Sequence, residues 1–186
     1  AQAPGLLDHP PGHAQAARLL QLDVDPVERP LQLINQAGLL AIVTTNQSGV
    51  ARGYFGQDLV EAVHARLQSL AAGAGARLDA IYYCPHHPAE GSPPWRAACD
   101  CRKPKPGMIL RAAREHGIDL EHSYVIGDSV VDIEAGAAAG VPGVLVLTGY
   151  GRGRLEHQKE RFRTPPVHAA ADLREAVLWI LERRAT

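Results

Sequence analysis

The stretch "SYVIGDSVVDIEAGAAAGVPGVLVLTG" at residues 123–149 decides the fold class. Its pattern predicts a strand at 123–128, a helix at 130–140 and a second apolar strand at 141–149. Two apolar strands joined by a helix favour a parallel sheet, which needs helices on both of its faces. The stretch therefore predicts an α/β protein.

The alternation of strands and helices continues along the rest of the chain. Apolar runs predict further strands at residues 39–45 and 78–84. Helices are predicted at residues 26–38, 56–75, 105–117 and 172–184. Pro30 predicts a late start or a bend in the first of these helices, because proline lacks the N–H that a helix interior needs. We expect a Rossmann-like three-layer parallel sheet in a single domain spanning residues 1–186.

Composition narrows the class of partner. The chain has 186 residues and a formal net charge of −1, so no global field attracts nucleic acid or an anionic membrane. No apolar run approaches the ~20 residues that span a bilayer, and "AQAPGLLDHPPGH" at residues 1–13 lacks the basic and apolar regions of a signal peptide. Three clustered cysteines argue against a disulfide framework. We therefore expect a cytoplasmic protein without nucleic-acid or membrane partners.

Polar residues follow the predicted strand at 39–45. The segment "TTNQSG" (44–49) leads into a loop with Gly49 and Gly53, and such a loop can offer backbone and side-chain donors to an anion. A simple strand-to-helix turn with a good N-cap is the alternative, and the pattern does not separate the two. The position is informative because parallel sheets bind ligands at the carboxyl ends of their strands.

Two aspartates follow the predicted strand at 123–128. Asp132 comes four residues after Asp128, one helical turn away, so both carboxylates can face one cavity, and Gly127 lets a ligand approach the backbone closely. Mg²⁺ prefers one or two carboxylates together with substrate phosphate. Alternatively, Asp128 or Ser129 only caps the next helix. Lys103, in a loop between the two strand ends, either neutralises a phosphate or is an ordinary surface lysine.

Cysteine and histidine gather in a C-x-H…C-x-C pattern across a loop at residues 84–101. Three thiolates and one imidazole suit a structural tetrahedral zinc ion, which can order a loop that has no core of its own. The ligands would be Cys84, His86, Cys99 and Cys101. His87 competes with His86 for the fourth position. The alternative is three buried free thiols and a surface histidine.

Four motifs in fixed order resemble a known family. They are "TNQSGVARGYF" (45–55), "IYYCPHHP" (81–88), "CDCRKPKPGM" (99–108) and "VIGDSVVD" (125–132). Together they look like the haloacid dehalogenase superfamily of phosphatases, and within it the zinc-bearing D-glycero-D-manno-heptose 1,7-bisphosphate phosphatase branch. The similarity covers about residues 13–150. The histidinol-phosphate phosphatases carry a similar cysteine loop, but it is usually shorter and they usually have aspartate where Ser48 stands, which favours the heptose branch.

The resemblance implies roles for the residues that would contact substrate. Thr45 and Asn46 would bind the transferred phosphoryl group, and Gln47 and Ser48 continue the same binding loop. Lys103 would stabilise negative charge on the nucleophile and the phosphate.

The resemblance also implies a distal contact and two metals. Arg102 would reach the distal part of the substrate. Asp128 would bind Mg²⁺ with Asp132 as its supporting carboxylate, and the C-x-H…C-x-C residues would bind zinc. Members of the family are cytoplasmic, mostly monomeric and carry only a minimal cap, and we expect the same here.

The first motif of the family, D-x-D-G, has no clear counterpart. Its first aspartate attacks phosphorus and its second is the general acid and base. An ungapped alignment from Thr45 places the motif near residues 2–6, which contain no carboxylate. Asp23 and Asp25 have the right spacing, but they lie about half as far from Thr45 as the family requires, and they equally predict a helix start. We expect the motif to lie upstream of this sequence or to have been lost.

The leading hypothesis is a Mg²⁺-dependent phosphatase that removes the 7-phosphate of D-glycero-D-manno-heptose 1,7-bisphosphate, a step toward nucleotide-activated heptose. One alternative is a catalytically impaired relative that only binds a sugar phosphate or a protein, which the missing motif favours. The retained Lys103, Asp128 and Asp132 favour the enzyme. Histidinol-phosphate phosphatase is the third hypothesis.

Overall fold

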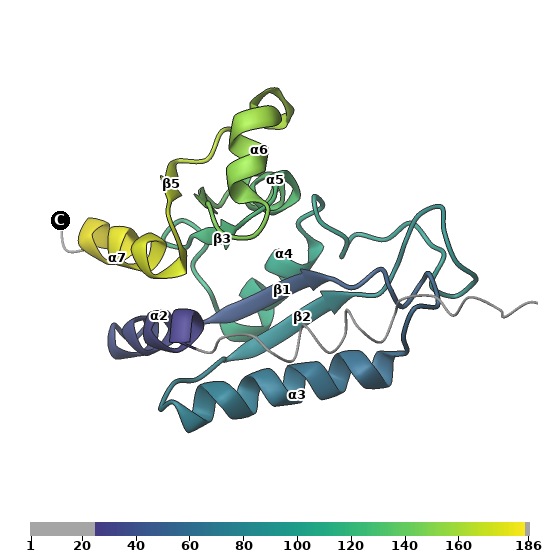
Figure 1. The fold of residues 1–186 in the computed structure, drawn as a ribbon, viewed down its shortest axis with the longest axis horizontal. Helices are drawn as coiled ribbons and strands as arrows, with labels where there is room; N and C mark the ends of the chain where they lie inside the picture. The colour runs from purple at the N-terminus through teal and green to yellow at the C-terminus, as the bar shows by residue number, and fades with distance from the viewer. Residues whose placement is uncertain (1–24, 185–186) are drawn as a thin grey trace, which may run out of the picture.

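The strands form two parallel sheets in the computed structural model, which describes residues 25–184 (Figure 1). One sheet pairs β1 with β2, and the other has the order β3-β4-β5. The strands are β1 (Ile42–Asn46), β2 (Ala80–Cys84), β3 (Val125–Gly127), β4 (Gly143–Val146) and β5 (His168–Ala170). Every pairing is parallel, with Val43 opposite Ile81 and Ile126 opposite Val144. The predicted α/β class is confirmed.

Helices connect the strands in the predicted order. They are α2 (Asp25–Gln36), α3 (Gln57–Gly73), α4 (Gly107–His116), α5 (Val130–Ala138), α6 (Gly151–His157), the 3₁₀ helix η1 (Lys159–Arg161) and α7 (Leu173–Arg184). The predicted stop of α4 is present at Gly117, whose φ of 62° glycine adopts without strain. A late start of α2 is not observed, because Pro30 lies inside a helix that begins at Asp25. The short elements α6, η1 and β5 were not predicted.

Alternating residues of the first sheet face two helical layers. Val43 and Ile81 pack into an apolar cluster with residues of α2 and α3. Ile42 and Tyr82 pack on the opposite side, against α4. In Figure 1, α3 runs along the β1–β2 pair. This sheet therefore has the helix cover on both faces that its apolar strands require.

The second sheet has the same construction. On one face α7 contributes Ala176 and Ile180 to a cluster with the strands. On the other face α5 contacts β3 and β4, and its Ile133 is 1% exposed. The contact between α2 and α7 links the helical layers of the two sheets. No helix of residues 25–184 is long and apolar enough to cross a membrane.

Ile133 provides a test of this packing. Replacing Ile133 with Ala should lower the free energy of unfolding by about 2–5 kcal/mol, because a buried side chain is lost and a cavity remains. Leu110→Ala on α4 is the control, since Leu110 is 41% exposed. Urea denaturation measures both. Equal destabilisation by the two substitutions would contradict the assigned position of α5.

Candidate active site

The side chain of Lys103 joins the carboxyl ends of the two sheets. Its Nζ donates a hydrogen bond to the backbone carbonyl of Thr44 in β1 at 2.7 Å and lies 2.6 Å from Oδ1 of Asp132 in α5. The side chains of Lys103 and Asp132 are only 12% and 11% exposed. Removing one partner of so buried an ion pair costs about 3–5 kcal/mol. Lys103 is therefore not an ordinary surface lysine.

Asn46, the last residue of β1, holds the backbone of Lys103. The Oδ1 atom of Asn46 accepts a hydrogen bond from the Lys103 N–H at 3.0 Å, and its Nδ2 donates to the Lys103 carbonyl at 3.0 Å. These reciprocal bonds fasten the loop before α4 to the end of β1. An amide group has two N–H donors, and within residues 25–184 only one of them has a partner, so the other is available for a ligand.

Asp132 uses its two carboxylate oxygens for different partners. Oδ1 pairs with Lys103, whereas Oδ2 accepts a hydrogen bond from the Ser129 N–H at 3.1 Å and so closes the start of α5. A Cβ atom at Gly127 would clash with the side chain of Asp132. The glycine therefore makes room for this carboxylate, whereas the sequence suggested that it makes room for a ligand.

Asp128 lies directly after β3, and the helix that follows is capped by Ser129 instead. Its Oδ2 accepts a hydrogen bond from the Tyr150 N–H at 3.0 Å. Within residues 25–184, its Oδ1 has no hydrogen-bond partner. Gly149 has a φ of 58°, and a Cβ atom there would clash with the Asp128 carboxylate. The chain thus leaves one oxygen of Asp128 available to a cation.

The other residues of the predicted binding loop form one ordered turn. Thr45 Oγ1 accepts a hydrogen bond from Gln47 Nε2 at 3.1 Å. The Gln47 N–H donates to the carbonyl of Cys84 at 2.8 Å, and the carbonyl of Ser48 accepts from the Arg52 N–H at 3.1 Å. The turn therefore begins at the carboxyl end of β1, next to Asn46.

The predicted zinc ligands converge. One ligand atom from each of Cys84, His86, Cys99 and Cys101 lies within 4.8 Å of the others, an arrangement that can hold a metal ion. The Sγ atom of Cys99 is 3.5 Å from that of Cys84 and 3.2 Å from that of Cys101. Burial raises the pKa of the Cys84 and Cys101 thiols. A bound cation would favour the thiolate form of these two groups.

His87 lies outside this cluster. Its Nδ1 accepts hydrogen bonds from the backbone N–H groups of Ala89 at 3.3 Å and Glu90 at 2.9 Å. Its Nε2 is 3.3 Å from Nη2 of Arg52. The geometry selects His86, whose Nδ1 is 3.7 Å and 3.5 Å from the sulfurs of Cys84 and Cys101.

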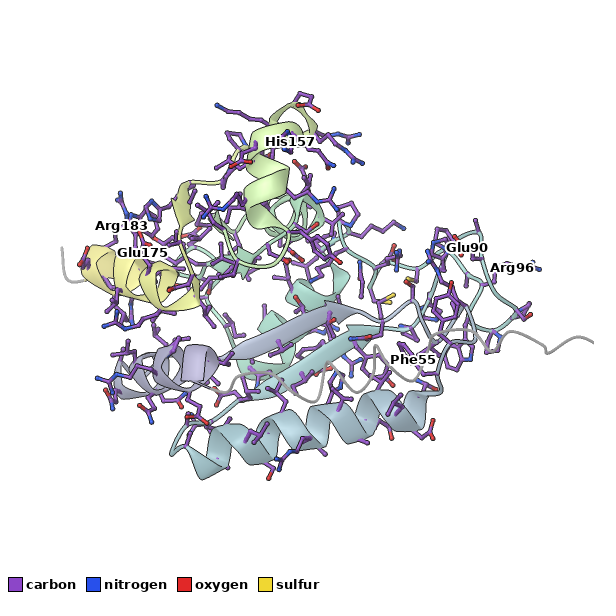
Figure 2. The ribbon with its side chains drawn as sticks, in the orientation of Figure 1. Phe55, Glu90, Arg96, His157, Glu175 and Arg183 are labelled. Carbon is purple, nitrogen blue, oxygen red and sulfur yellow. The ribbon has the colours of Figure 1, made fainter. Side chains whose placement is uncertain are left out.

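Arg102 connects the cysteine cluster to the strand ends. Its Nη1 donates a hydrogen bond to the carbonyl of His86 at 3.1 Å, and its neighbour in sequence is Lys103. The loop that carries the cluster also carries Glu90 and Arg96, which lie at the opposite end of the molecule from Arg183 of α7 (Figure 2). A displacement of His86 can therefore be transmitted to Lys103 through Arg102 alone.

The residues that hold Asp128 in place were not predicted from the sequence, and one predicted residue, Asp23, lies outside the described part of the chain. Gly149 and the backbone of Tyr150 position Asp128, and their only signal was a glycine at the end of an apolar run. Asp23 lies outside the described residues, and Asp25 is the first residue of α2. The hypothesis of an Asp23 or Asp25 nucleophile therefore stays open.

A parallel α/β fold with a lysine and two aspartates at its strand ends defines a haloacid dehalogenase-like hydrolase. The HAD-hydrolase-like family model matches residues 100–176. A D-glycero-D-manno-heptose-1,7-bisphosphate 7-phosphatase of Thermosynechococcus vestitus is 39% identical over 180 residues, which are 95% of this chain and 91% of that protein. The chain belongs to this family of heptose bisphosphate phosphatases.

Further relatives and one solved structure agree. The corresponding phosphatase of Pseudomonas aeruginosa is 47% identical over 118 residues, which are 63% of this chain and 62% of that protein. The Pseudomonas putida protein is 48% identical and is matched over 66% of its length, so both matches span less than two thirds of the relative. The D,D-heptose 1,7-bisphosphate phosphatase of B. bronchiseptica, complexed with magnesium and phosphate, superposes with a TM-score of 0.73. It is 34% identical, with 85% of this chain and 83% of that chain covered.

Gly127→Ala tests the tight packing around Asp132. The added methyl group should displace the Asp132 side chain, weaken its pairing with Lys103 and lower the free energy of unfolding by about 1–3 kcal/mol. Gly73→Ala is the control, because a Cβ atom at this helical glycine meets nothing within 4 Å. Thermal unfolding compares the two variants. An unchanged melting temperature in Gly127→Ala would mean that Asp132 lies elsewhere in solution.

Proposed function

We propose that this site binds and hydrolyses the 7-phosphate of D-glycero-D-manno-heptose 1,7-bisphosphate in a Mg²⁺-dependent reaction. The observation that carries the proposal is the position of Lys103, whose ammonium group is buried between Thr44 and Asp132 at the meeting point of the two sheets. Fixed positive charge at a strand end is what stabilises a transferring phosphoryl group. The identity of the sugar in this proposal is taken from the related heptose bisphosphate phosphatases.

Asp128 would hold the magnesium ion. Its Oδ1 atom is available, and Asp132 can support the site from one helical turn away while it remains paired with Lys103. Hard oxygen ligands of this kind suit Mg²⁺, and the ion would neutralise phosphate charge when bound. Tyr150 and Gly149 keep the Asp128 carboxylate in place through the hydrogen bond and the space described above.

The remaining roles follow from position. Thr45 and the free N–H of Asn46 would donate hydrogen bonds to the phosphoryl oxygens, with Gln47 and Ser48 in the same turn. An attacking carboxylate is required for an aspartyl-phosphate route. Among residues 25–184, the carboxylate paired with Lys103 is that of Asp132, and both of its oxygens are engaged. The attacking group therefore has to come from elsewhere.

We further propose that the cysteine cluster holds structural zinc. With Zn–S bonds of about 2.3 Å and Zn–N bonds of about 2.0 Å, a tetrahedral site separates two sulfurs by about 3.8 Å and sulfur from nitrogen by about 3.5 Å. The sulfur–nitrogen separations of 3.7 and 3.5 Å agree with this geometry. The sulfur–sulfur separations of 3.5 and 3.2 Å are shorter than the tetrahedral value, so the sulfurs would move apart on binding. A zinc ion would fix His86, whose carbonyl accepts the hydrogen bond from Arg102. The guanidinium group of Arg102 would then be held in position to contact the distal end of the sugar.

The proposal also covers the cellular location and the oligomeric state of the protein. The three cysteines form no disulfide bond within residues 25–184, which fits a reducing cytoplasmic environment. We propose a monomer, by the same family relationship.

Zinc content distinguishes His86 from its neighbour. We expect about one zinc ion per chain, loss of most of it in His86→Ala and in Cys99→Ser, and full retention in the matched control His87→Ala. Metal analysis by mass spectrometry after dialysis measures all four proteins. Retention of zinc in His86→Ala together with loss in His87→Ala would reverse the ligand assignment.

Mg²⁺ binding tests Asp128. The substitution Asp128→Asn should weaken Mg²⁺ affinity at least about tenfold, since an ionic ligand becomes neutral, and should leave the far-ultraviolet circular dichroism spectrum unchanged. Glu156→Gln is a charge-matched control outside the strand ends. Calorimetric titration measures both. Equal affinity in Asp128→Asn and the wild type would remove the metal assignment.

Phosphate release tests the reaction and the sugar. We expect Mg²⁺-dependent release from heptose 1,7-bisphosphate that is faster than release from histidinol phosphate, and slow in absolute terms while no attacking carboxylate lies beside Lys103. Faster cleavage of histidinol phosphate would support the other branch. Phosphate binding without any release would favour an impaired relative. Turnover that disappears in Asp23→Asn would identify Asp23 as the nucleophile.

A further inference from the structure

The sulfur atoms of the cysteine cluster lie close enough to react with one another. The Sγ atom of Cys99 is 3.5 Å from that of Cys84 and 3.2 Å from that of Cys101, so Cys99 belongs to both short contacts. A disulfide bond needs a separation of about 2.0 Å, and a tetrahedral zinc site needs about 3.8 Å. The sulfurs therefore lie between the two arrangements.

Cys99 is the member of the cluster that a small solute reaches most easily. It is half-buried, and the residues on either side of it, Ala98 and Asp100, are both exposed. Cys101 is half-buried as well, but only one of its neighbours in sequence is exposed. Cys84, the last residue of β2, is 0% exposed and can react only with a group inside the cluster. Because oxidation of cysteine follows exposure, Cys99 is the first sulfur that an oxidant would modify.

The backbone between Cys84 and Cys99 already holds the two ends of this loop together. The His87 carbonyl accepts a hydrogen bond from the Ala97 N–H at 3.1 Å, and the His87 N–H donates to the Trp95 carbonyl at 3.0 Å. These bonds place the third residue after Cys84 beside the second residue before Cys99. The chain itself therefore brings the two cysteines together, without a metal ion.

We propose that Cys84 and Cys99 form a reversible disulfide bond when the protein is exposed to a peroxide, and that this modification dismantles the metal-ligand set. Only the second part rests on the proposed zinc site. Cys84 and Cys99 are 15 positions apart, whereas Cys99 and Cys101 are two positions apart. A disulfide that closes a longer loop is stabilised more, because it removes more freedom from the unfolded chain. This difference favours Cys84 over Cys101 as the partner of Cys99.

The reaction consumes one peroxide molecule and two thiols. The sulfur of Cys99 attacks one peroxide oxygen, the O–O bond breaks, and one water is released as Cys99 becomes a sulfenic acid. The sulfur of Cys84 then attacks the sulfur of Cys99 and displaces its hydroxyl group as a second water, which forms the S–S bond. Two electrons pass from the sulfurs to the peroxide oxygens, and both thiol protons end in the waters. A thiol reductant reverses the change by exchange.

The disulfide would act on Arg102 and leave Lys103 in place. His86 and Cys101 would remain as ligands, which are too few for a structural zinc site. His86 would lose its fixed position, and its carbonyl is the group that accepts the hydrogen bond from Arg102 at 3.1 Å. Lys103 keeps its separate contacts with β1 and α5. Oxidation would therefore loosen the arginine and spare the charges at the strand ends.

Peptide mapping of the whole 186-residue chain after treatment with hydrogen peroxide identifies the bond. The remaining thiols are alkylated, and cleavage on the amino side of aspartate then gives the fragments 79–99 and 100–118. Cys84 and Cys99 share the first fragment, and Cys101 is the cysteine of the second. We expect fragment 79–99 to be lighter by two hydrogen atoms and free of alkyl groups, and fragment 100–118 to be alkylated. A thiol reductant should restore all three thiols.

Release of metal is a second readout. A chromogenic chelator should detect about one zinc ion released for each disulfide formed, because the four-ligand site is lost. If metal analysis finds no zinc in the untreated protein, the zinc site fails but the mass of fragment 79–99 still decides the disulfide. Failure of the proposed zinc site and failure of this proposal are therefore distinguishable.

Two matched variants, Cys99→Ser and Cys101→Ser, separate the disulfide from the metal. Each removes one ligand, so both should lose zinc to a similar extent. In protein freed of metal by a chelator, loss of thiols to peroxide should be at least about tenfold slower in Cys99→Ser than in the wild type, because the most accessible sulfur is gone. The rate should be unchanged in Cys101→Ser, which keeps both partners of the proposed bond. Circular dichroism checks that both variants are folded.

Three results would overturn the proposal. Fragments 79–99 and 100–118 joined to each other would assign the bond to Cys101. A gain of oxygen atoms on Cys99 without the loss of two hydrogen atoms would mean that this thiol oxidises irreversibly instead. Thiols that stay unreacted in the folded protein but react after unfolding in urea would mean that the cluster is closed to peroxide.

Discussion

The ammonium group of Lys103 is the point at which the two halves of the structure meet. The sheets β1–β2 and β3–β4–β5 share no strand pairing within residues 25–184. On one face α2 packs on α7, and at the carboxyl ends Lys103 links the carbonyl of Thr44 to the carboxylate of Asp132. A charge buried this deeply is stable only while both contacts persist. The geometry of the strand ends and the alignment of the two sheets therefore depend on the same atom.

The surroundings of Lys103 show how short segments of sequence organise the site. Asn46 fixes the backbone of Lys103 from β1. The residue before it, Arg102, bonds through its guanidinium group to the carbonyl of His86 in the cysteine loop. Cys101 of the cluster, Arg102 and Lys103 are consecutive in the chain. A loop with few buried apolar residues is thus tied at both ends, by its ligand set and by hydrogen bonds to a strand end. Preorganised charge of this kind needs no rearrangement when an anion arrives.

Much of this arrangement could be predicted because it follows from local patterns. Apolar runs identified β1 to β4, and the C-x-H…C-x-C spacing identified four ligand atoms that do converge. The spacing also predicted His86 as the fourth member with His87 as its competitor, but the contacts with Glu90 and Arg52 that keep His87 outside the cluster could not be predicted. The part played by Gly149 depends on a contact between β4 and β3. The separation into two sheets could not be predicted either, because nothing in the runs at residues 39–45 and 123–128 marks either strand as a sheet edge.

The half-buried state of β1 has a consequence for the behaviour of the protein in concentrated solution. Residues 39–45 contain neither proline nor a charged side chain, so no gatekeeper residue interrupts the segment. Within residues 25–184, β1 has a paired strand on one side only, and an unpaired strand edge is a template for pairing between molecules. Colloidal stability should therefore be limited by this edge rather than by surface charge, and it should improve with anything that occupies or blocks it.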